Sequence, residues 1–242
     1  MKTAERHRLK TNEFAETLAA VGDFWTANRQ RLFAVALAIL LLVAAVGAFA
    51  WWRSQRGAAA AAGLSQAMSM AQAQILSSPQ APAGSFPTEA ARDEAMLKRL
   101  MEVAGAYPNT AAGLTARYEA AALLSRLGRA AEAQREFEAV AGRAGSSIYG
   151  RMAQLGIADL QVRAGQFDPA IATFRELAAR ADTDMPADGI LMQLARAYVL
   201  AGKRAEALQT FTRVYEEHPD SSYAADARRE ADAIKAGPAT RS

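Results

Sequence analysis

The sequence predicts an all-α protein in which one apolar N-terminal helix precedes a solenoid of helical hairpins. Two observations lead to this fold class: residues 32–52 carry no charge, and three residue types recur further along at a period of 37 residues. The chain has 242 residues, enough for a domain of ordinary size besides an anchor. It contains no cysteine, which excludes disulfides, cysteine zinc sites and thiol catalysis.

Residues 32–52 read LFAVALAILLLVAAVGAFAWW and form the predicted transmembrane helix. At about 1.5 Å per residue such a helix is about 31 Å long, which matches the roughly 30 Å hydrocarbon core of a bilayer. A core helix of a soluble domain would keep a polar face, and this stretch has none. Ala48-Phe49-Ala50 resembles a cleavage site, so a cleavable signal peptide remains the alternative. Because the apolar run is longer than in such peptides, we expect a retained anchor.

The charges that flank the span predict its orientation. Only Arg53 and Arg56 follow it closely, whereas six basic residues precede it: Lys2, Arg6, Arg8, Lys10, Arg29 and Arg31. The positive-inside rule therefore predicts a single-pass protein of the inner (cytoplasmic) membrane. Its N-terminus is expected in the cytoplasm and its repeat domain in the periplasm or another extracytoplasmic space.

The arm before the span, residues 1–31, combines a basic start with apolar residues at helical spacing: Phe14, Leu18, Val21 and Trp25. Two interpretations stay open, a helix lying on anionic lipid and a docking helix for a membrane partner. The arm carries six Lys and Arg against four Asp and Glu, and residues 53–242 carry 22 against 21. This nearly neutral part lacks the basic field that neutralises phosphates, so we expect no nucleic-acid binding.

Three residue types return at an offset of 37 residues and predict three helical hairpins. They are Gly128, Gly165 and Gly202; Ala133, Ala170 and Ala207; and Phe137, Phe174 and Phe211. We expect the glycine to turn the chain, the alanine to let the two helices approach closely, and the phenylalanine to fill the space between hairpins. Pro219 is expected to end the last hairpin. Asp168-Pro169 is expected to begin the second helix of the middle hairpin, with Asp168 as the cap.

Weaker signals extend the array at both ends. One period before the first hairpin, Met96 and Leu100 predict the second helix of a degenerate hairpin within residues 89–108. Its first helix is expected in the alanine-rich stretch Ala58–Leu76, before the loop SSPQAPAGSFP. After Pro219, a capping helix is predicted by an apolar stripe of Tyr223, Ala227, Ala231 and Ile234.

These signals divide the exported part into three segments. Residues 53–87 hold the alanine-rich helix and its loop, residues 88–236 the repeat domain, and residues 237–242 a tail.

The last hairpin resembles the tetratricopeptide repeat (TPR), a helix-turn-helix unit. The matching residues are Leu191, Leu194, Ala195, Tyr198, Gly202, Ala207, Phe211 and Pro219. The other hairpins depart from the signature, with Leu124 and Gln161 in the place of Tyr198. The period also exceeds the usual 34 residues, and we assign the additional residues to the loops AGSSIYG and ADTDMPADG.

The TPR resemblance implies that the first helix of each hairpin lines a concave groove that binds proteins or peptides. The residues at groove positions are Tyr118, Leu155, Asp159, Met192 and Arg196. A groove containing Met, Leu and Tyr suits an extended or helical apolar segment better than an acidic tail.

Catalytic groups are sparse, so we expect no enzyme, no cofactor and no small-molecule substrate. His7 and His218 lie on opposite sides of the membrane in the predicted topology and cannot share a site. The segment DTDMPAD suggests calcium, but Pro186 occupies a ligand position and Gln193 stands where the closing Glu belongs. We therefore predict no metal site, and Asp188 is expected to cap a helix.

The order of arm, span and repeats is similar to the ancillary subunit family of the Sec translocon (YfgM-like). The segments FWTANRQRL, with Trp25 and Asn28, and WWR resemble the anchor region of that family. The resemblance implies a scaffold that binds translocon subunits, exported clients or periplasmic chaperones. The alternative function is a structural coordinator of cell-envelope assembly or cell division that acts through TPR interactions. An enzyme, suggested only by isolated carboxylates, is the third hypothesis.

Overall fold

The computed structural model describes residues 3–78, 82–182 and 184–237, with side chains for 29–31 and from 33 onward. Its helices are α1 (Thr3–Ser69), the short 3-10 helix η1 (Met70–Gln72), α2 (Glu89–Ala106), α3 (Ala111–Arg126), α4 (Ala130–Ala144), α5 (Ile148–Arg163), α6 (Phe167–Ala179), α7 (Ala187–Leu200), α8 (Arg204–Glu217) and α9 (Ala224–Ala236). The described residues contain no strand, only a single β-bridge between Ile75 and Phe86. The chain forms two compact units, Met1–Gln55 and Arg56–Ser242. The predicted all-α fold is confirmed.

The first unit contains the predicted anchor. The helical segment Arg29–Gln72, which runs through α1 into η1, includes a window of mean hydropathy 2.9, and none of that window is buried. By length and composition this helix can span a membrane. The side chains of Phe14, Leu18, Val21 and Trp25 lie outside the described part, as does that of Leu32, so both interpretations of the arm stay predictions.

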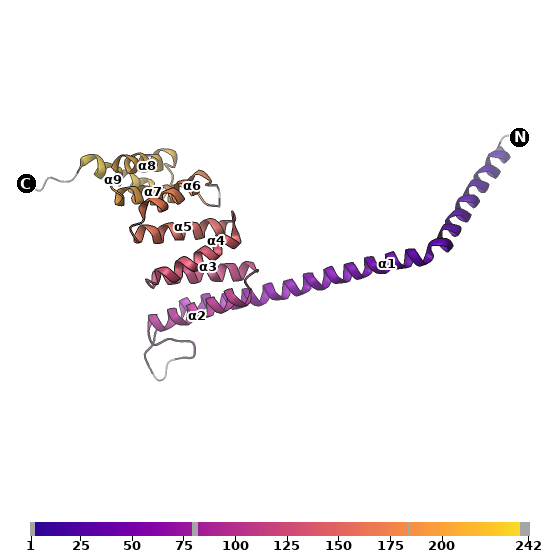
Figure 1. Cartoon of the computed structure of the whole chain (residues 1–242), viewed down its shortest axis with the longest axis horizontal. Coiled ribbons are helices and arrows are strands. Elements are labelled where there is room, and N and C mark those ends of the chain that lie inside the picture. Colours follow the sequence, from indigo (N-terminus) through magenta and orange to yellow (C-terminus); the bar gives the residue numbers. More distant parts are fainter. Residues whose placement is uncertain (1–2, 79–81, 183, 238–242) are drawn as a thin grey trace, which may run out of the picture. The chain divides into compact units, whose positions relative to one another are not determined.

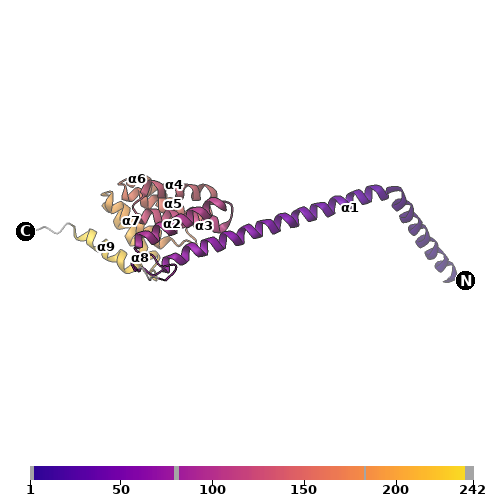
Figure 2. The ribbon, with the colours of Figure 1, turned by 90° about the horizontal axis from the view of Figure 1, so that it is seen from below.

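The second unit stacks α2 to α9 in chain order, from magenta to yellow in the ribbon (Figure 1 and Figure 2). Its first hairpin pairs α2 with the alanine-rich end of α1, where Ala60 and Ala67 are fully buried. A Cβ added at Gly63 would lie 2.7 Å from Val103 Cγ2, so small residues permit this close crossing. The predicted helix Ala58–Leu76 is confirmed except at its end. The chain leaves helix after Gln72, because the backbones of residues 74–76 and 86 bond to each other instead.

The same turn closes each of the next three hairpins. Gly128, Gly165 and Gly202 adopt φ values of 76°, 76° and 74°, which glycine tolerates without strain. In each turn the N–H after the glycine donates to the carbonyl five residues earlier, as Arg129 donates to Leu124 at 2.9 Å. The glycine N–H donates to the carbonyl three residues earlier, and the two bonds together form a Schellman motif. The predicted role of the three glycines is confirmed.

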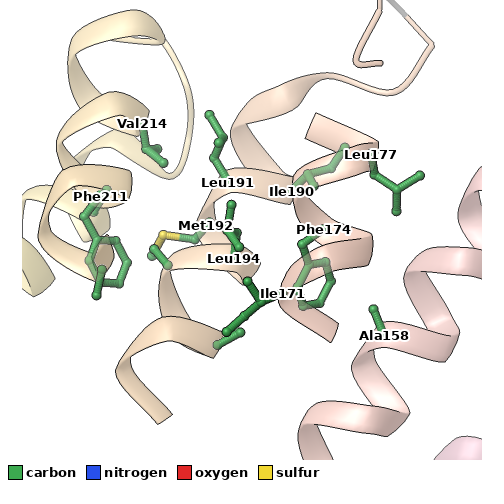
Figure 3. Packing of buried hydrophobic residues seen from close by; sticks show 14 of the residues in the cluster. Ala158, Ile171, Phe174, Leu177, Ile190, Leu191, Met192, Leu194, Phe211 and Val214 are labelled. Carbon is green, nitrogen blue, oxygen red and sulfur yellow. The ribbon is translucent and has the colours of Figure 1, made fainter. Parts of the chain in front are cut away.

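The recurring alanines and phenylalanines form the hairpin cores as predicted. Ala133, Ala170 and Ala207 are fully buried, and Phe137, Phe174 and Phe211 are at most 3% exposed. Figure 3 shows Phe174 of α6 and Phe211 of α8 in one cluster of buried apolar side chains with Leu191, Met192 and Leu194 of α7. Met96 and Leu100 are buried in α2, as the degenerate hairpin requires.

The predicted capping helix is α9, which buries Ala227 and Ala231 against the last hairpin. Arg204 of α8 donates a hydrogen bond of 2.7 Å to the carbonyl of Ile234, near the end of α9. The guanidinium of Arg228 lies 5.0 Å from the centre of the Tyr215 ring, a cation–π distance. Pro219 follows the end of α8 at Glu217, as predicted. Of the predicted tail 237–242, only Gly237 lies among the described residues.

Two local predictions were wrong, and a third was right only in part. Asp168 does not cap α6, which begins one residue earlier at Phe167; its carboxylate instead accepts a hydrogen bond of 2.7 Å from Lys203. Asp188 does not cap α7 either, because that helix starts at Ala187 and the carboxylate accepts the Ser221 hydroxyl at 2.6 Å. The assignment of the additional residues to two loops was right for ADTDMPADG, since residues 180–186 lie between α6 and α7, and wrong for most of AGSSIYG, since only residues 145–147 lie between α4 and α5.

Asp182, from the calcium-like segment, tethers the loop between α6 and α7 to α5. Its carboxylate accepts hydrogen bonds from both terminal nitrogens of the buried Arg151, at 2.8 and 3.2 Å. It also accepts the backbone N–H groups of Asp184 and Met185. These bonds, chiefly those from Arg151, hold the pKa of Asp182 below its usual value.

Gly113→Ala is expected to lower the free energy of unfolding by about 1–3 kcal/mol, because overpacking forces the backbone apart. A Cβ at this position would lie 1.9 Å from the carbonyl oxygen of Tyr107, in the turn before α3. Gly142→Ala is the control, since its Cβ would meet nothing within 4 Å, and it should stabilise α4 by about 0.5–1 kcal/mol. Urea unfolding of the full chain in lipid nanodiscs measures both. Equal effects of the two substitutions would contradict the packing at Gly113.

Asp182→Asn is expected to lower the unfolding midpoint most near neutral pH and progressively less in acid. A carboxyl group whose pKa is lowered by folding stabilises the protein above its unfolded pKa of about 3.9. That stabilisation disappears as the pH falls through the lower folded pKa, where Asp182 becomes protonated. Thermal unfolding between about pH 6 and about pH 3 measures this difference. Asp184→Asn, two residues further on, is the control and should leave the pH profile unchanged.

Candidate functional site

A groove of about 380 Å³ lies on α5, α6 and α7. Asp159 and Val162 of α5 form one wall, and Arg196 and Leu200 of α7 form the other. The ring of Tyr223, which immediately precedes α9, also lines this groove. The stacking of successive hairpins therefore leaves a surface hollow walled by the first helices of two hairpins.

The floor of the groove is part of the hydrophobic core. Phe174 and Met192 line it, yet each is only 1% exposed and packs in the cluster shown in Figure 3. Both side chains therefore have a structural role that does not depend on any occupant. Leu200 and Tyr223 are 58% and 41% exposed, so they are the apolar side chains that an occupant can cover.

The structure brings together three of the five predicted groove residues. Asp159, Met192 and Arg196 line the groove, with Met192 at the floor. Leu155 is half-buried and packs against the core of the C-terminal hairpins, outside the lining. Tyr118 lies on α3, where its ring is 5.7 Å from that of Phe137 and 6.5 Å from that of Tyr149. The predicted set therefore does not form one continuous patch.

Burial controls the acid–base properties of this face. It raises the pKa of Asp159 above its usual value, while the nearby Arg163 opposes the shift. Burial also raises the pKa of Tyr118, and the negative charges of Glu119 and Asp159 add to the effect. Among the described residues, neither Asp159 nor Arg196 forms an ion pair. The groove thus presents one acidic and one basic side chain between apolar walls.

The sequence prediction missed Leu200, Val162 and Tyr223. Leu200 follows Arg196 by four residues and therefore lies on the same helical face, a signal that the spacing contains. Tyr223 is predicted only as part of the apolar stripe of the capping helix. Its ring packs beside Gly189, where a Cβ would lie 3.4 Å from the ring, an ordinary van der Waals distance.

The described side chains that the sequence suggests for metal binding or catalysis lie outside the lining of this groove. Asp182 is engaged by Arg151, as described above. His218 lines a separate hollow with Asp188 and Ser221. Within the part of the chain that the structure describes, no group of three or more His, Cys, Asp or Glu side chains is placed to hold a metal ion.

Comparison with solved structures finds similar helical-repeat proteins. One is a crystal structure of nearly identical TPR-like repeats of a kinesin light chain candidate from Podosopora anserina, at 18% identity and a TM-score of 0.45. The match covers 64% of this chain and 92% of that one. A substituted form of those repeats matches at 17% identity and a TM-score of 0.45, with 61% and 89% coverage.

No curated protein matches the chain. Residues 108–231 match the tetratricopeptide repeat-like domain family, and this segment is just over half of the 242 residues. It runs from the turn before α3 into α9 and includes all three copies of the glycine, alanine and phenylalanine pattern. The chain therefore belongs to the tetratricopeptide repeat-like domain family.

Proposed function

We propose that this protein is a membrane-anchored scaffold that binds a segment of a protein partner in the groove between α5 and α7. TPR-like domains typically serve protein–protein interaction and are not enzymes. The observation that carries the proposal is the exposure of Leu200 and Tyr223 beside a well-packed floor. Large apolar side chains gathered at a hollow gain free energy when a partner covers them.

The groove favours a segment that is mainly apolar and carries a few polar groups. Leu200 and Val162 offer contact surface to aliphatic or aromatic side chains on opposite walls. Asp159 and Arg196, which lack ion-pair partners in the described part, can orient such a segment through opposite charges. An acidic tail would meet only one basic side chain in the lining, Arg196.

The proposed setting is the inner membrane, with residues 32–52 as the span, the N-terminus in the cytoplasm and the solenoid in the periplasm. The excess of basic residues before the span supports this orientation. The resemblance of the anchor region to the ancillary subunit family of the Sec translocon supports a position beside the protein-conducting channel. There the groove would receive exported clients or periplasmic chaperones.

A photo-crosslinking amino acid at Arg196 is expected to capture a discrete partner in cells, because this side chain stands at the groove wall. The same amino acid at the exposed Gln209, on α8 and outside the groove lining, is the control. Leu200→Asp should reduce the Arg196 crosslink about tenfold or more, as expected for a hot-spot position. Leu76→Asp, at another exposed leucine, should leave it unchanged. Equal crosslinking from Arg196 and Gln209 would contradict binding in the groove.

The full chain, purified in mild detergent with a C-terminal tag, is expected to enrich subunits of the protein-conducting channel. Replacing residues 1–52 with an unrelated single span should abolish the enrichment while leaving the repeat domain exported. Protease added to spheroplasts should degrade the repeat domain in both proteins, which verifies the orientation. Failure to enrich channel subunits, combined with septal localisation of a fluorescent fusion, would instead favour the function in envelope assembly or division.

A further inference from the structure

The second unit has two separate hydrophobic clusters, and α5 contributes to both. Ala153, Ile157 and Leu160 belong to the cluster of the N-terminal helices, which includes residues of α2, α3 and α4. Leu155, Ala158 and Val162 belong to the other cluster, with residues of α6 to α9. Among the described helices, the other members of each cluster come from one side of α5 only. The continuity of the solenoid core therefore depends on this helix.

An ion pair joins the second helices of neighbouring hairpins on each side of α5, but the equivalent positions of α4 and α6 hold no such pair. Arg129 at the start of α4 pairs with Glu94 of α2 at 3.3 Å, and Lys203 at the start of α8 pairs with Asp168 of α6 at 2.7 Å. Both pairs join residues at equivalent repeat positions. Between α4 and α6 these positions hold Ala131 and Gln166, which cannot form an ion pair.

Helix α5 also holds two buried side-chain polar atoms without a hydrogen-bond partner, more than any other described helix. The Oε1 atom of Gln161 is buried without a hydrogen-bond partner, whereas Leu124 and Tyr198 hold this position in α3 and α7. The Nε atom of Arg151, at the other end of α5, is likewise buried and unpartnered. Burying a polar atom without a partner favours any conformation that gives water access to it. Gly156 in mid-helix further lowers the helix propensity of α5.

From these three observations we infer that the solenoid bends at α5. The helices α2 to α4 form one body, α6 to α9 form the other, and α5 is the joint between them. The groove wall of Asp159 and Val162 belongs to this joint, so bending changes its separation from Arg196 and Leu200 of α7. Only this effect on the groove rests on the proposed function, because the joint is inferred from the hydrophobic clusters, the ion pairs and the buried polar atoms.

Spin labels at four equivalent positions test the joint in the full chain in lipid nanodiscs. Lys98, Arg135, Ala172 and Gln209 are exposed, lie 37 residues apart and fall on α2, α4, α6 and α8. The absence of cysteine permits paired Cys substitutions without further change. Pulsed electron–electron double resonance should give a distance distribution about twice as broad for Arg135 and Ala172 as for the two flanking pairs. Equal widths for the three pairs would overturn the joint.

A second experiment restores the missing ion pair between α4 and α6. Ala131→Asp with Gln166→Lys copies the Asp168–Lys203 pair and should narrow the Arg135–Ala172 distribution to the width of its neighbours. Ala131→Asp with Gln166→Asn is the matched control and should leave it broad, because no cation faces the new carboxylate. If both double variants narrow the distribution equally, the ion pair does not control the joint and this inference is wrong. Crosslinking from Arg196 is measured separately, so loss of the joint and loss of partner binding are distinguishable.

Discussion

The close crossing of two helices at a fully buried alanine is the contact on which the rest of the solenoid depends. Ala133, Ala170 and Ala207 leave no exposed surface, and a larger side chain at any of them would separate the two helices of its hairpin. A single hairpin cannot bury its remaining apolar face alone, so the next hairpin must cover it. The phenylalanine of each copy fills the space that this stacking creates. The glycine turns fix how the two helices of a hairpin cross, because the hydrogen bonds of the Schellman motif set the direction of the second helix relative to the first.

Stacking also explains why the candidate site has a well-packed floor and exposed side chains at its rim. The helices that line the groove, α5 and α7, pack on the phenylalanine of α6 beneath them. Side chains at the rim are therefore available to an occupant, while the floor resists collapse. The ion pair between Arg151 and Asp182 attaches the loop that joins α6 and α7 to α5 through a partly buried contact.

Much of the fold could be predicted from the sequence, because the residues that build it are restricted by geometry. A positive φ selects glycine and a close crossing selects alanine, so both recur at the repeat period. The first turns of α3 and α5 also contain a glycine, Gly113 and Gly150, which close packing and not φ requires, because a Cβ there would lie 1.9 or 2.0 Å from a backbone carbonyl oxygen. The third hairpin has Ala187 there because a longer loop precedes α7. Because Ala187 stands at the third position, this glycine recurs only twice at the 37-residue period.

The site was harder to predict than the fold. Met192 and Arg196 share a helical face, yet the depth of the groove leaves one in the core and the other in solvent. Sequence periodicity predicts which face of a helix a residue lies on, but not how deeply its side chain is buried. It therefore could not distinguish the buried Met192 from the exposed Arg196. Tyr223 reaches the groove from another element, which no spacing within one helix can reveal. The cap predictions were wrong for a related reason, since the Asp168 carboxylate pairs with Lys203 of the following hairpin and the Asp188 carboxylate accepts the hydroxyl of Ser221, in the turn before α9.

The polar outer surface of α9 has a consequence for the state of association of the chain. Ala227 and Ala231 bury one face, and the opposite face exposes charged side chains: Arg228, Arg229, Glu230, Asp232 and Lys235. A solenoid that ended in an uncovered apolar face would accept the first hairpin of a second copy, and because that contact is head-to-tail it would repeat without closing. The charged face of α9 therefore opposes growth of copies into filaments from this end of the array.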